Sequence, residues 1–260
     1  SVDPGHAAGR EGNWLDYLNE GGSFGVTVTL DGSNESLATD TYGDTDHIFY
    51  FQHVRGTNEV DTITGDQYNN QLNGYNGADI LDGGAGDDQI NGGAGNDTIY
   101  SGTGDDTIAG GDDDDSIYGD AGQDTLNGDA GNGYIEGGGD ADEIYGDDGD
   151  DTIYGDDGAD LIDGGLGADL IYGGLGDDFI NGGDHADTIY GGDGNDNITL
   201  YFGGGTASAD TVYGEAGDDY ISMFNNDNAN DYVDGGAGID TLYVRQNTTT
   251  TGTVIDLTNG

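Results

Sequence analysis

The sequence predicts an all-β solenoid in which short strands alternate with tight, glycine-rich loops. A nine-residue motif, Gly-Gly-x-Gly-x-Asp-x-aliphatic-x, occurs sixteen times without interruption over residues 56–199 and four more times up to residue 243. The aliphatic position is kept in all twenty copies, and the aspartate is kept in eighteen. A nine-residue period does not suit helices, whereas it fits one short strand followed by one turn.

Residues 1–55 precede the repeats and are expected to form a small N-terminal β cap. Residues 23–30 and 47–54 are rich in aromatic and β-branched side chains, which is typical of strands. Such strands would cover the first coil, whose apolar side chains and backbone edge would otherwise face water. Trp14 is most simply a core residue of this cap.

Residues 56–243 are expected to form the solenoid itself. In each copy the glycine-rich half supplies turn conformations, and the x-aliphatic-x half is a three-residue strand whose centre points inward. Two copies would make one coil, so each copy lies about 4.8 Å from the copy two further on. Asp113, Asp140 and His185 stand where glycine is usual. Aspartate tolerates left-handed backbone better than most residues, so these loops should still form.

Stacked copies would align the aspartates into two ladders, interrupted by Asn70 and Gly133. Carboxylates at strand spacing repel one another. A Ca²⁺ ion between successive aspartates of a ladder, which we call its rungs, would replace this repulsion with attraction. Calcium takes six to eight oxygens at about 2.3–2.6 Å, from carboxylates and loop carbonyls together, whereas Mg²⁺ requires a smaller and stricter octahedron. The predicted ligands are Asp61, Asp79, Asp88, Asp97, Asp106, Asp115, Asp124, Asp142, Asp151, Asp160, Asp169, Asp178, Asp187 and Asp196. Pairing each copy with the copy two further on allows up to about 18 ions.

Composition narrows the possible partners and chemistry. The chain has 54 acidic residues, three arginines and no lysine, which gives a formal net charge of −51. Such a surface repels nucleic acids, anionic membranes and acidic polysaccharides, and it attracts small cations. Cysteine is absent, so no thiolate can bind a soft metal. No segment is long and apolar enough for a membrane helix, and no zinc-protease or serine-nucleophile motif occurs, so we expect a noncatalytic chain without membrane insertion.

Energetics predict that folding requires the metal. Each eighteen-residue coil buries two aliphatic side chains, which contribute about 1.5–3 kcal/mol each. Ordering the backbone costs about 1–2 kcal/mol per residue, which is severalfold more than this burial returns. Calcium binding must then supply folding free energy, and the metal-free chain is expected to be disordered.

These repeats resemble the repeats-in-toxin (RTX) family of hemolysin-type calcium-binding nonapeptides, over about residues 56–243. The resemblance implies a right-handed parallel β-roll with calcium between successive loops. It also implies extracellular location (secreted or at the cell surface), export by a type I secretion apparatus, and a chain that stays unfolded in the calcium-poor cytosol. It extends the ligand role to Asp210, Asp219, Asp231 and Asp240, and it assigns no catalytic residue.

Tyrosines occupy the last motif position on one side of the predicted coil, at Tyr100, Tyr118, Tyr154, Tyr172, Tyr190 and Tyr213. They either stack and stiffen the roll or form a contact surface for a glycan, ice or a protein. Three functions therefore stay open: a folding, secretion or spacer module, a binding module, and a noncatalytic carrier domain of a larger secreted enzyme. Residues 244–260 are expected to be a tail or the start of a further module, because 252–260 echo 25–32.

Overall fold

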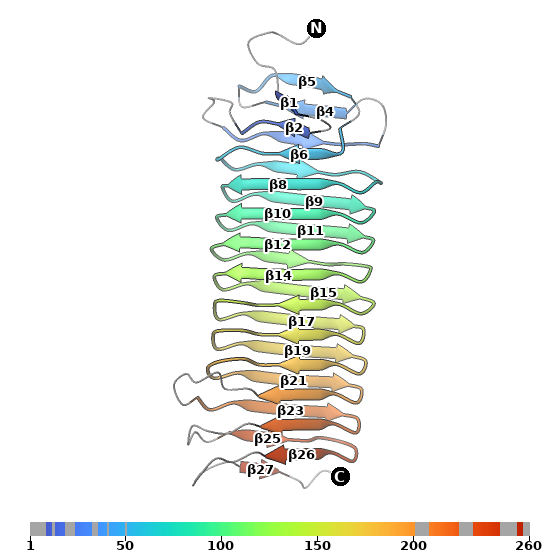
Figure 1. Ribbon diagram of the computed structural model, residues 1–260, viewed down its shortest axis with the longest axis vertical. Helices are drawn as coiled ribbons and strands as arrows, with labels where there is room; N and C mark the ends of the chain where they lie inside the picture. Colours follow the sequence, from blue (N-terminus) through green and yellow to red (C-terminus); the bar gives the residue numbers. More distant parts are fainter. Residues whose placement is uncertain are drawn as a thin grey trace. The chain divides into compact units, whose positions relative to one another are not determined.

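The computed structural model of the protein describes residues 9–11, 14–18, 24–32, 36–40, 42–49, 51–200, 208–223, 231–244 and 254–256. Every regular element among these residues is a β-strand, and the strands form a parallel β-roll with two repeats per coil (Figure 1). The chain divides into two compact units, Ser1–Thr125 and Leu126–Gly260. The parallel β-roll predicted from the nine-residue period is confirmed.

The first unit contains the cap and the first repeats. Its strands are β1 (Gly9–Glu11), β2 (Trp14–Asp16), β3 (Thr27–Thr29), β4 (Ser36–Thr39), β5 (Thr45–Ile48), β6 (His53–Arg55), β7 (Thr62–Thr64), β8 (Gln71–Asn76), β9 (Ile80–Ala85), β10 (Gln89–Ala94), β11 (Thr98–Thr103), β12 (Thr107–Asp112) and β13 (Ser116–Tyr118). One sheet has the order β1-β2-β6-β8-β10-β12, and the other has the order β5-β4-β3-β7-β9-β11-β13. Consecutive repeats therefore alternate between two sheets.

The second unit has the same alternation of strands between two sheets. Its strands are β14 (Thr125–Ala130, which begins at the boundary), β15 (Tyr134–Gly139), β16 (Glu143–Tyr145), β17 (Thr152–Asp157), β18 (Leu161–Asp163), β19 (Leu170–Leu175), β20 (Phe179–Asn181), β21 (Thr188–Asp193), β22 (Asn197–Leu200), β23 (Thr211–Ala216), β24 (Tyr220–Met223), β25 (Tyr232–Asp234), β26 (Thr241–Val244) and β27 (Val254–Asp256). Even-numbered strands form one sheet and odd-numbered strands form the other.

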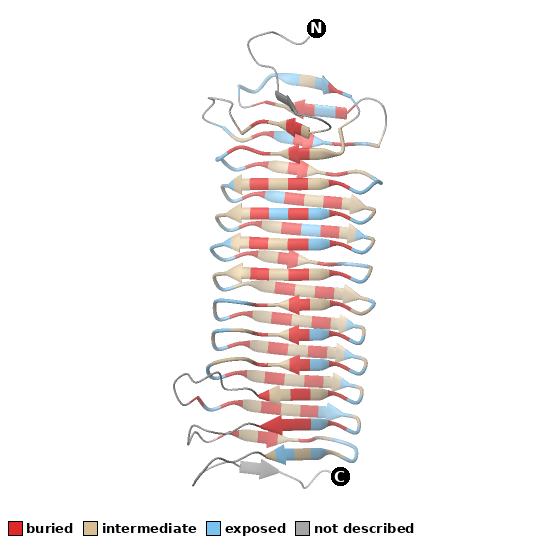
Figure 2. Ribbon diagram, in the orientation of Figure 1, coloured by how far each residue is buried: buried red, intermediate tan, exposed pale blue. Residues whose placement is uncertain are grey.

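The core is a single file of aliphatic side chains along each sheet. In the second unit Ile153 pairs in register with Ile171, and Ile171 pairs with Ile189, so identical positions stack on one another. The repeat aliphatics from Ile63 to Val233 are at most 3% exposed. Figure 2 shows them as buried centres of the strands, with more exposed residues on either side. The repeat strands from β7 to β25 thus contribute the one aliphatic core residue that the motif predicts, and β22 and β24 add Leu200 and Met223.

The N-terminal cap continues this core before it closes the end of the unit. Leu15 of β2 pairs in parallel with Val54 of β6, and Val28 of β3 pairs in parallel with Ile63 of β7. All four side chains are 0% exposed. Antiparallel strands then finish the sheets, with β1 against β2 and β4 and β5 beyond β3. The cap is therefore built from the same core file plus antiparallel edges.

Two details of the cap differ from the sequence prediction. The segment 47–54 is not one strand, because β5 ends at Ile48 in one sheet and β6 begins at His53 in the other. Trp14 is only half-buried, with its ring beside His53 and the Arg55 guanidinium 4.3 Å from the ring centre. Strand composition indicates β structure, but it does not show where the chain crosses between sheets.

The loops use the backbone conformations that the motif predicts. Asp113, Asp140 and His185 take positive φ angles of 82°, 77° and 91° in place of glycine. At the C-terminal end, β27 pairs in parallel with β25, so residues 254–256 continue the stacking of the repeats. The other residues predicted as a tail or further module, 245–253 and 257–260, lie outside the described part of the chain.

Candidate metal centre

The predicted aspartate ladders are present in both units, and one carboxylate oxygen of each rung fixes the neighbouring coil. In the first unit the Asp88 Oδ1 accepts the Asn70 backbone N–H at 2.7 Å, and the Asp106 Oδ1 accepts the Asp88 N–H at 2.7 Å. In the second unit the Asp178 Oδ1 accepts the Asp160 N–H at 2.9 Å. These bonds hold the loops in register, because each rung is tied to the one before it.

All eighteen predicted ligands lie in these rows. Those of the first unit are Asp61, Asp79, Asp97 and Asp115 in one row and Asp88, Asp106 and Asp124 in the other. Those of the second unit are Asp151, Asp169, Asp187, Asp210 and Asp231 in one row and Asp142, Asp160, Asp178, Asp196, Asp219 and Asp240 in the other. Asp240, in the last rung of its row, is half-buried, and the others are at most 3% exposed.

The second carboxylate oxygen of most rungs is buried without a hydrogen-bond donor. This orphaned Oδ2 atom is found at Asp79, Asp88, Asp97, Asp106, Asp151, Asp160, Asp169, Asp178, Asp187, Asp196 and Asp219. Folded proteins leave only a few buried polar atoms per hundred residues without partners, because each costs free energy. A regular series of acceptors therefore indicates that a cation satisfies them.

Backbone carbonyls of the next coil face the same space. A Cβ added to Gly83 would lie 2.4 Å from the Asp88 Oδ2 and 2.5 Å from the Ser101 carbonyl oxygen. The corresponding distances at Gly173 are 2.5 Å to the Asp178 Oδ2 and 2.3 Å to the Gly191 carbonyl. The missing side chain at the first motif position thus leaves a cradle lined by oxygen atoms of two coils.

Carbonyls at the second and fourth motif positions point along the coil stack in the same way. A Cβ on Gly93 would meet the Tyr75 carbonyl oxygen at 2.0 Å, and one on Gly95 would meet the Gly77 carbonyl at 1.9 Å. Glycine is therefore required here for two reasons, its positive φ and this close approach. The loops bring main-chain oxygens from neighbouring turns to the gap beside the aspartates.

Burial raises the pKa of the ladder carboxyls far above the ordinary value. It raises the pKa of Asp88 and of Asp178 to about 7, and that of Asp187 to about 8. The largest cause is the loss of water around the charged form, and repulsion by the neighbouring rungs adds to it. Donation from the preceding backbone N–H opposes the shift. The ion-free ladder is thus an unfavourable place for negative charge.

The donor set fits calcium. In the described part of the chain no three His, Cys, Asp or Glu side chains converge as a metal site. The oxygens around each gap are those of the rungs and of the loop carbonyls beside them. Carboxylate and carbonyl oxygens are the ligands of hard cations, and Ca²⁺ accepts six to eight of them in flexible geometry. A bound Ca²⁺ would supply the charge that the Oδ2 atoms lack. Asp160 and Asp178 are representative of the residues that would hold it.

The ladders end differently at the N-terminal side of the first unit. The Asp61 Oδ2 accepts the Thr57 N–H at 2.6 Å, and its Oδ1 accepts the Val26 N–H at 2.6 Å and the Thr57 hydroxyl at 3.0 Å. The Asn70 Nδ2 donates to the Gln52 carbonyl at 3.1 Å. Protein donors thus saturate the Asp61 carboxylate, which was predicted as a metal ligand. The Thr57 side chain could not have been assigned this role from the repeat pattern, because glycine usually occupies its position.

A second, exposed row of hydrogen bonds runs along the fifth motif position and was not predicted. The Asp87 Oδ1 accepts the Asp105 N–H at 3.2 Å, and the Asp105 Oδ1 accepts the Gln123 N–H at 3.0 Å. In the second unit the Asp177 Oδ1 accepts the Asn195 N–H at 2.7 Å. These bonds run in the opposite direction to those of the buried ladder. The recurrence of Asp and Asn at this position was the available signal.

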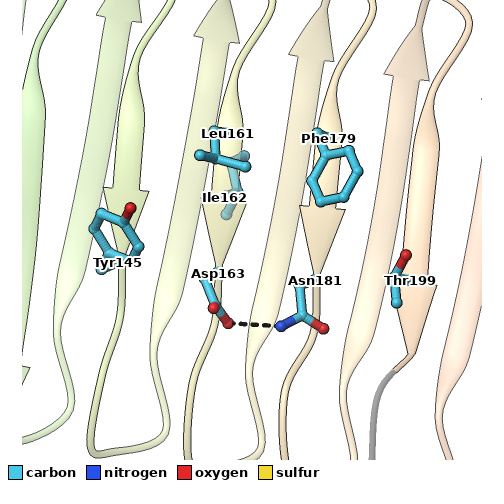
Figure 3. A pocket seen from close by; sticks show the side chains of 7 residues that line it. All are labelled: Tyr145, Leu161, Ile162, Asp163, Phe179, Asn181 and Thr199. Carbon is cyan, nitrogen blue, oxygen red and sulfur yellow. Dashed lines mark hydrogen bonds between the residues drawn. The ribbon is translucent and has the colours of Figure 1, made fainter.

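The outer faces of the second unit offer other surfaces. Tyr154, Tyr172, Tyr190 and Tyr213 stack with ring centres 4.8–4.9 Å apart and planes within 9° of parallel. The opposite sheet has a hollow of about 360 Å³, where Leu161 and Phe179 lie side by side (Figure 3). Its carboxylate, Asp163, already accepts the Asn181 amide at 2.9 Å. The hollow contains one buried amide oxygen without a donor, the Asn181 Oδ1, whereas the ladders present a regular series of such oxygens on carboxylates. The ladders are therefore the candidate functional site.

The fold and this site together define a calcium-binding β-roll. The model of the RTX calcium-binding nonapeptide repeat matches residues 55–198, 205–222 and 227–243, and the chain belongs to this family. No curated protein matches the chain. Among the described residues, no helix is long and apolar enough to cross a bilayer.

Replacing one buried rung should weaken calcium-dependent folding. Asp160→Asn removes a charge next to two gaps while keeping the shape, and we expect it to raise the calcium midpoint about two- to fivefold. Asp157→Asn removes the same charge from an exposed position at the end of β17 and is the control. Circular dichroism titrated with CaCl₂ measures both midpoints. Equal shifts of the calcium midpoint in the two variants would contradict calcium binding at the buried ladder.

Restoring the missing rung should have the opposite effect. Gly133 lacks a positive φ, and the nearest atom to an added Cβ is the Asp151 Oδ1 at 3.2 Å, so Gly133→Asp needs only a small shift. We expect a lower calcium midpoint and a higher melting temperature in calcium, because one gap gains a carboxylate.

The matched control is Asn132→Asp, which adds the same charge at the adjacent exposed position. Its carboxylate can still accept the Asp150 N–H, as the Asn132 amide does at 2.9 Å. A calcium midpoint that falls equally in both variants, or that rises in Gly133→Asp, would argue against a site at this gap.

The raised pKa values also predict how pH affects the calcium-free chain. The folded chain binds protons more tightly than the unfolded chain, whose aspartates have ordinary pKa values near 3.8. The stability of the calcium-free roll should therefore fall as pH rises from about 4 through 7–8. Far-ultraviolet circular dichroism in calcium-depleted buffer should show β signal at pH 5.5 that is lost by pH 8. A signal that does not change with pH would be inconsistent with buried carboxylates.

Proposed function

We propose that this chain is a noncatalytic, calcium-dependent folding module of a secreted protein. At low calcium the chain is disordered, and outside the cell it folds as ions fill the gaps between coils. The observation that carries this proposal is the series of eleven buried Oδ2 atoms without donors. The chain has too few cationic side chains to neutralise their charge, since it contains three arginines and no lysine.

The energetics of the chain support calcium binding as the event that drives folding, rather than as a step that follows it. Most repeat strands contribute one aliphatic side chain to the core, which is too little to offset the ordering of a nine-residue repeat. The buried carboxylates add a further cost when no metal is bound. An unfolded polyanion can pass through a narrow channel, so the same property suits export by a type I secretion apparatus.

Once loaded with calcium, the module acts as a folding aid for its neighbours or as a rigid extracellular spacer. The hydrogen bonds along both ladder rows make each coil depend on the next, as in other repeat proteins. A carrier domain attached to a secreted enzyme is compatible with this function. The enzyme itself would then be another part of the same protein.

A contact surface at the tyrosine face is the second candidate function. It is favoured by the row of four rings that stack on the outer face of the second unit. Stacking covers the flat ring faces and leaves edges and hydroxyls outward. The row therefore suits an ice or protein partner better than a sugar that packs on ring faces.

A calcium titration tests the main proposal. We expect circular dichroism to show a disordered chain in chelator at pH 8 and a cooperative gain of β signal at about 10⁻⁴–10⁻³ M Ca²⁺, the range of extracellular modules. Mg²⁺ at the same concentrations should have little effect, because it requires a smaller and stricter site. A chain fully folded in chelator at pH 8 would refute the proposal.

A further inference from the structure

A separate groove lies beside the tyrosine row of the second unit. It has a volume of about 330 Å³ and opens on the outer face of the sheet that contains β17, β19, β21 and β23. Strand register places Asp156, Gly174, Gly192 and Glu215 in one row. The neighbouring rows contain Tyr172 and Tyr190 on one side and Leu175 on the other. The groove is thus defined by residues of four successive coils.

Glycine forms the floor of this groove and cannot be replaced there. An added Cβ would lie 2.2 Å from the Asp156 carbonyl oxygen at Gly174 and 2.1 Å from the Gly174 carbonyl at Gly192. At the two ends of the row, Asp156 and Glu215 adopt a φ of 70°, which admits a side chain. Their carboxylates therefore bound a floor whose ends are three rungs apart, or about 14 Å.

The walls of the groove combine apolar and acidic surface. Tyr172 and Tyr190 stack at 4.9 Å, and Leu175 is 52% exposed. Four carboxylates surround these groups, those of Asp156, Asp157, Asp193 and Glu215. No cationic side chain faces them in the described part of the chain, and the protein has no lysine. An occupant must therefore bring positive charge together with an apolar body.

These features select a small, linear cation. The groove is too short for a folded protein, which needs about 800 Å² of contact on each side. A hydrated Ca²⁺ ion gains nothing from the tyrosine and leucine wall and binds better to the oxygen-lined gaps. We propose that the groove binds a linear aliphatic polyamine, with its terminal ammonium groups at Asp156 and Glu215 and its methylene chain along Tyr172, Tyr190 and Leu175.

Calorimetric titration of the calcium-saturated chain with spermine tests this inference. The variants are Asp156→Gly, Glu215→Gly and the double variant, which restore the glycine that the motif usually has at these positions, so folding should be preserved. The control is Asp147→Gly, which removes a carboxylate from the same motif position, also at a positive φ of 66°, in a loop away from the groove.

We expect the double variant to bind spermine about tenfold more weakly, and the control to bind as the unaltered chain does. A diamine long enough to reach both ends should also bind more tightly than putrescine, which has the same charge. Equal binding by the double variant and the control, or affinity that does not depend on diamine length, would overturn the proposal. The calcium midpoint of folding should be unchanged in all variants. A loss of spermine binding with an unchanged midpoint is then due to the groove and not to a failure of calcium-dependent folding.

Discussion

The structure depends on neutralising two rows of buried carboxylates. Each rung uses its Oδ1 atom to accept a backbone N–H of the preceding coil, as Asp178 does for Asp160, and this bond fixes the strand register. The Oδ2 atom of Asp178, like that of ten other rungs, is buried without a donor, and it lies beside a loop carbonyl of the next coil. One residue type therefore couples register to metal binding. Hydrogen bonds orient the ladder, whereas at a pH above the raised pKa values a bound cation offsets the cost of burying its charge.

The glycines follow from this arrangement. Neighbouring coils approach so closely at the loops that a Cβ on Gly95 would lie 1.9 Å from the Gly77 carbonyl oxygen. Such loops bring main-chain oxygens to the gaps beside the aspartates but contribute little apolar surface, which leaves one buried aliphatic side chain in most repeat strands. The first rungs show how the ladder oxygens can be satisfied without a metal. At Asp61 three donors from Thr57 and Val26 saturate the carboxylate, and at Asn70 an amide replaces it. Protein donors thus close the ladder at the end that adjoins the cap.

Periodicity predicted which residues stack from Asp61 to Asp196, and the resemblance to the RTX family extended the set to Asp240. Periodicity could not predict that one carboxylate oxygen accepts a backbone N–H while the other has no donor. The Asp88 Oδ1 accepts the backbone N–H of Asn70, and a backbone N–H leaves no signal in the sequence because nearly all residue types have one. The exposed row through Asp87 and Asp105 was missed although Asp and Asn recur at the fifth motif position, because other copies have different residues there. Strand composition also failed to separate β5 from β6, which lie in different sheets. Local pattern therefore gave the repeat and its metal chemistry, whereas details of hydrogen bonding and sheet crossing depend on neighbouring coils.

The most direct measurement is the position of calcium itself. Crystals grown in millimolar CaCl₂ and measured for the anomalous scattering of calcium would locate each ion relative to the rungs. We expect anomalous peaks between successive rungs, beside the Oδ2 atoms of residues such as Asp160 and Asp178 and the carbonyls of their loops. An intact roll whose ladder gaps contain no anomalous peak, or whose peaks lie only at exposed loop carboxylates, would contradict calcium binding at the ladders.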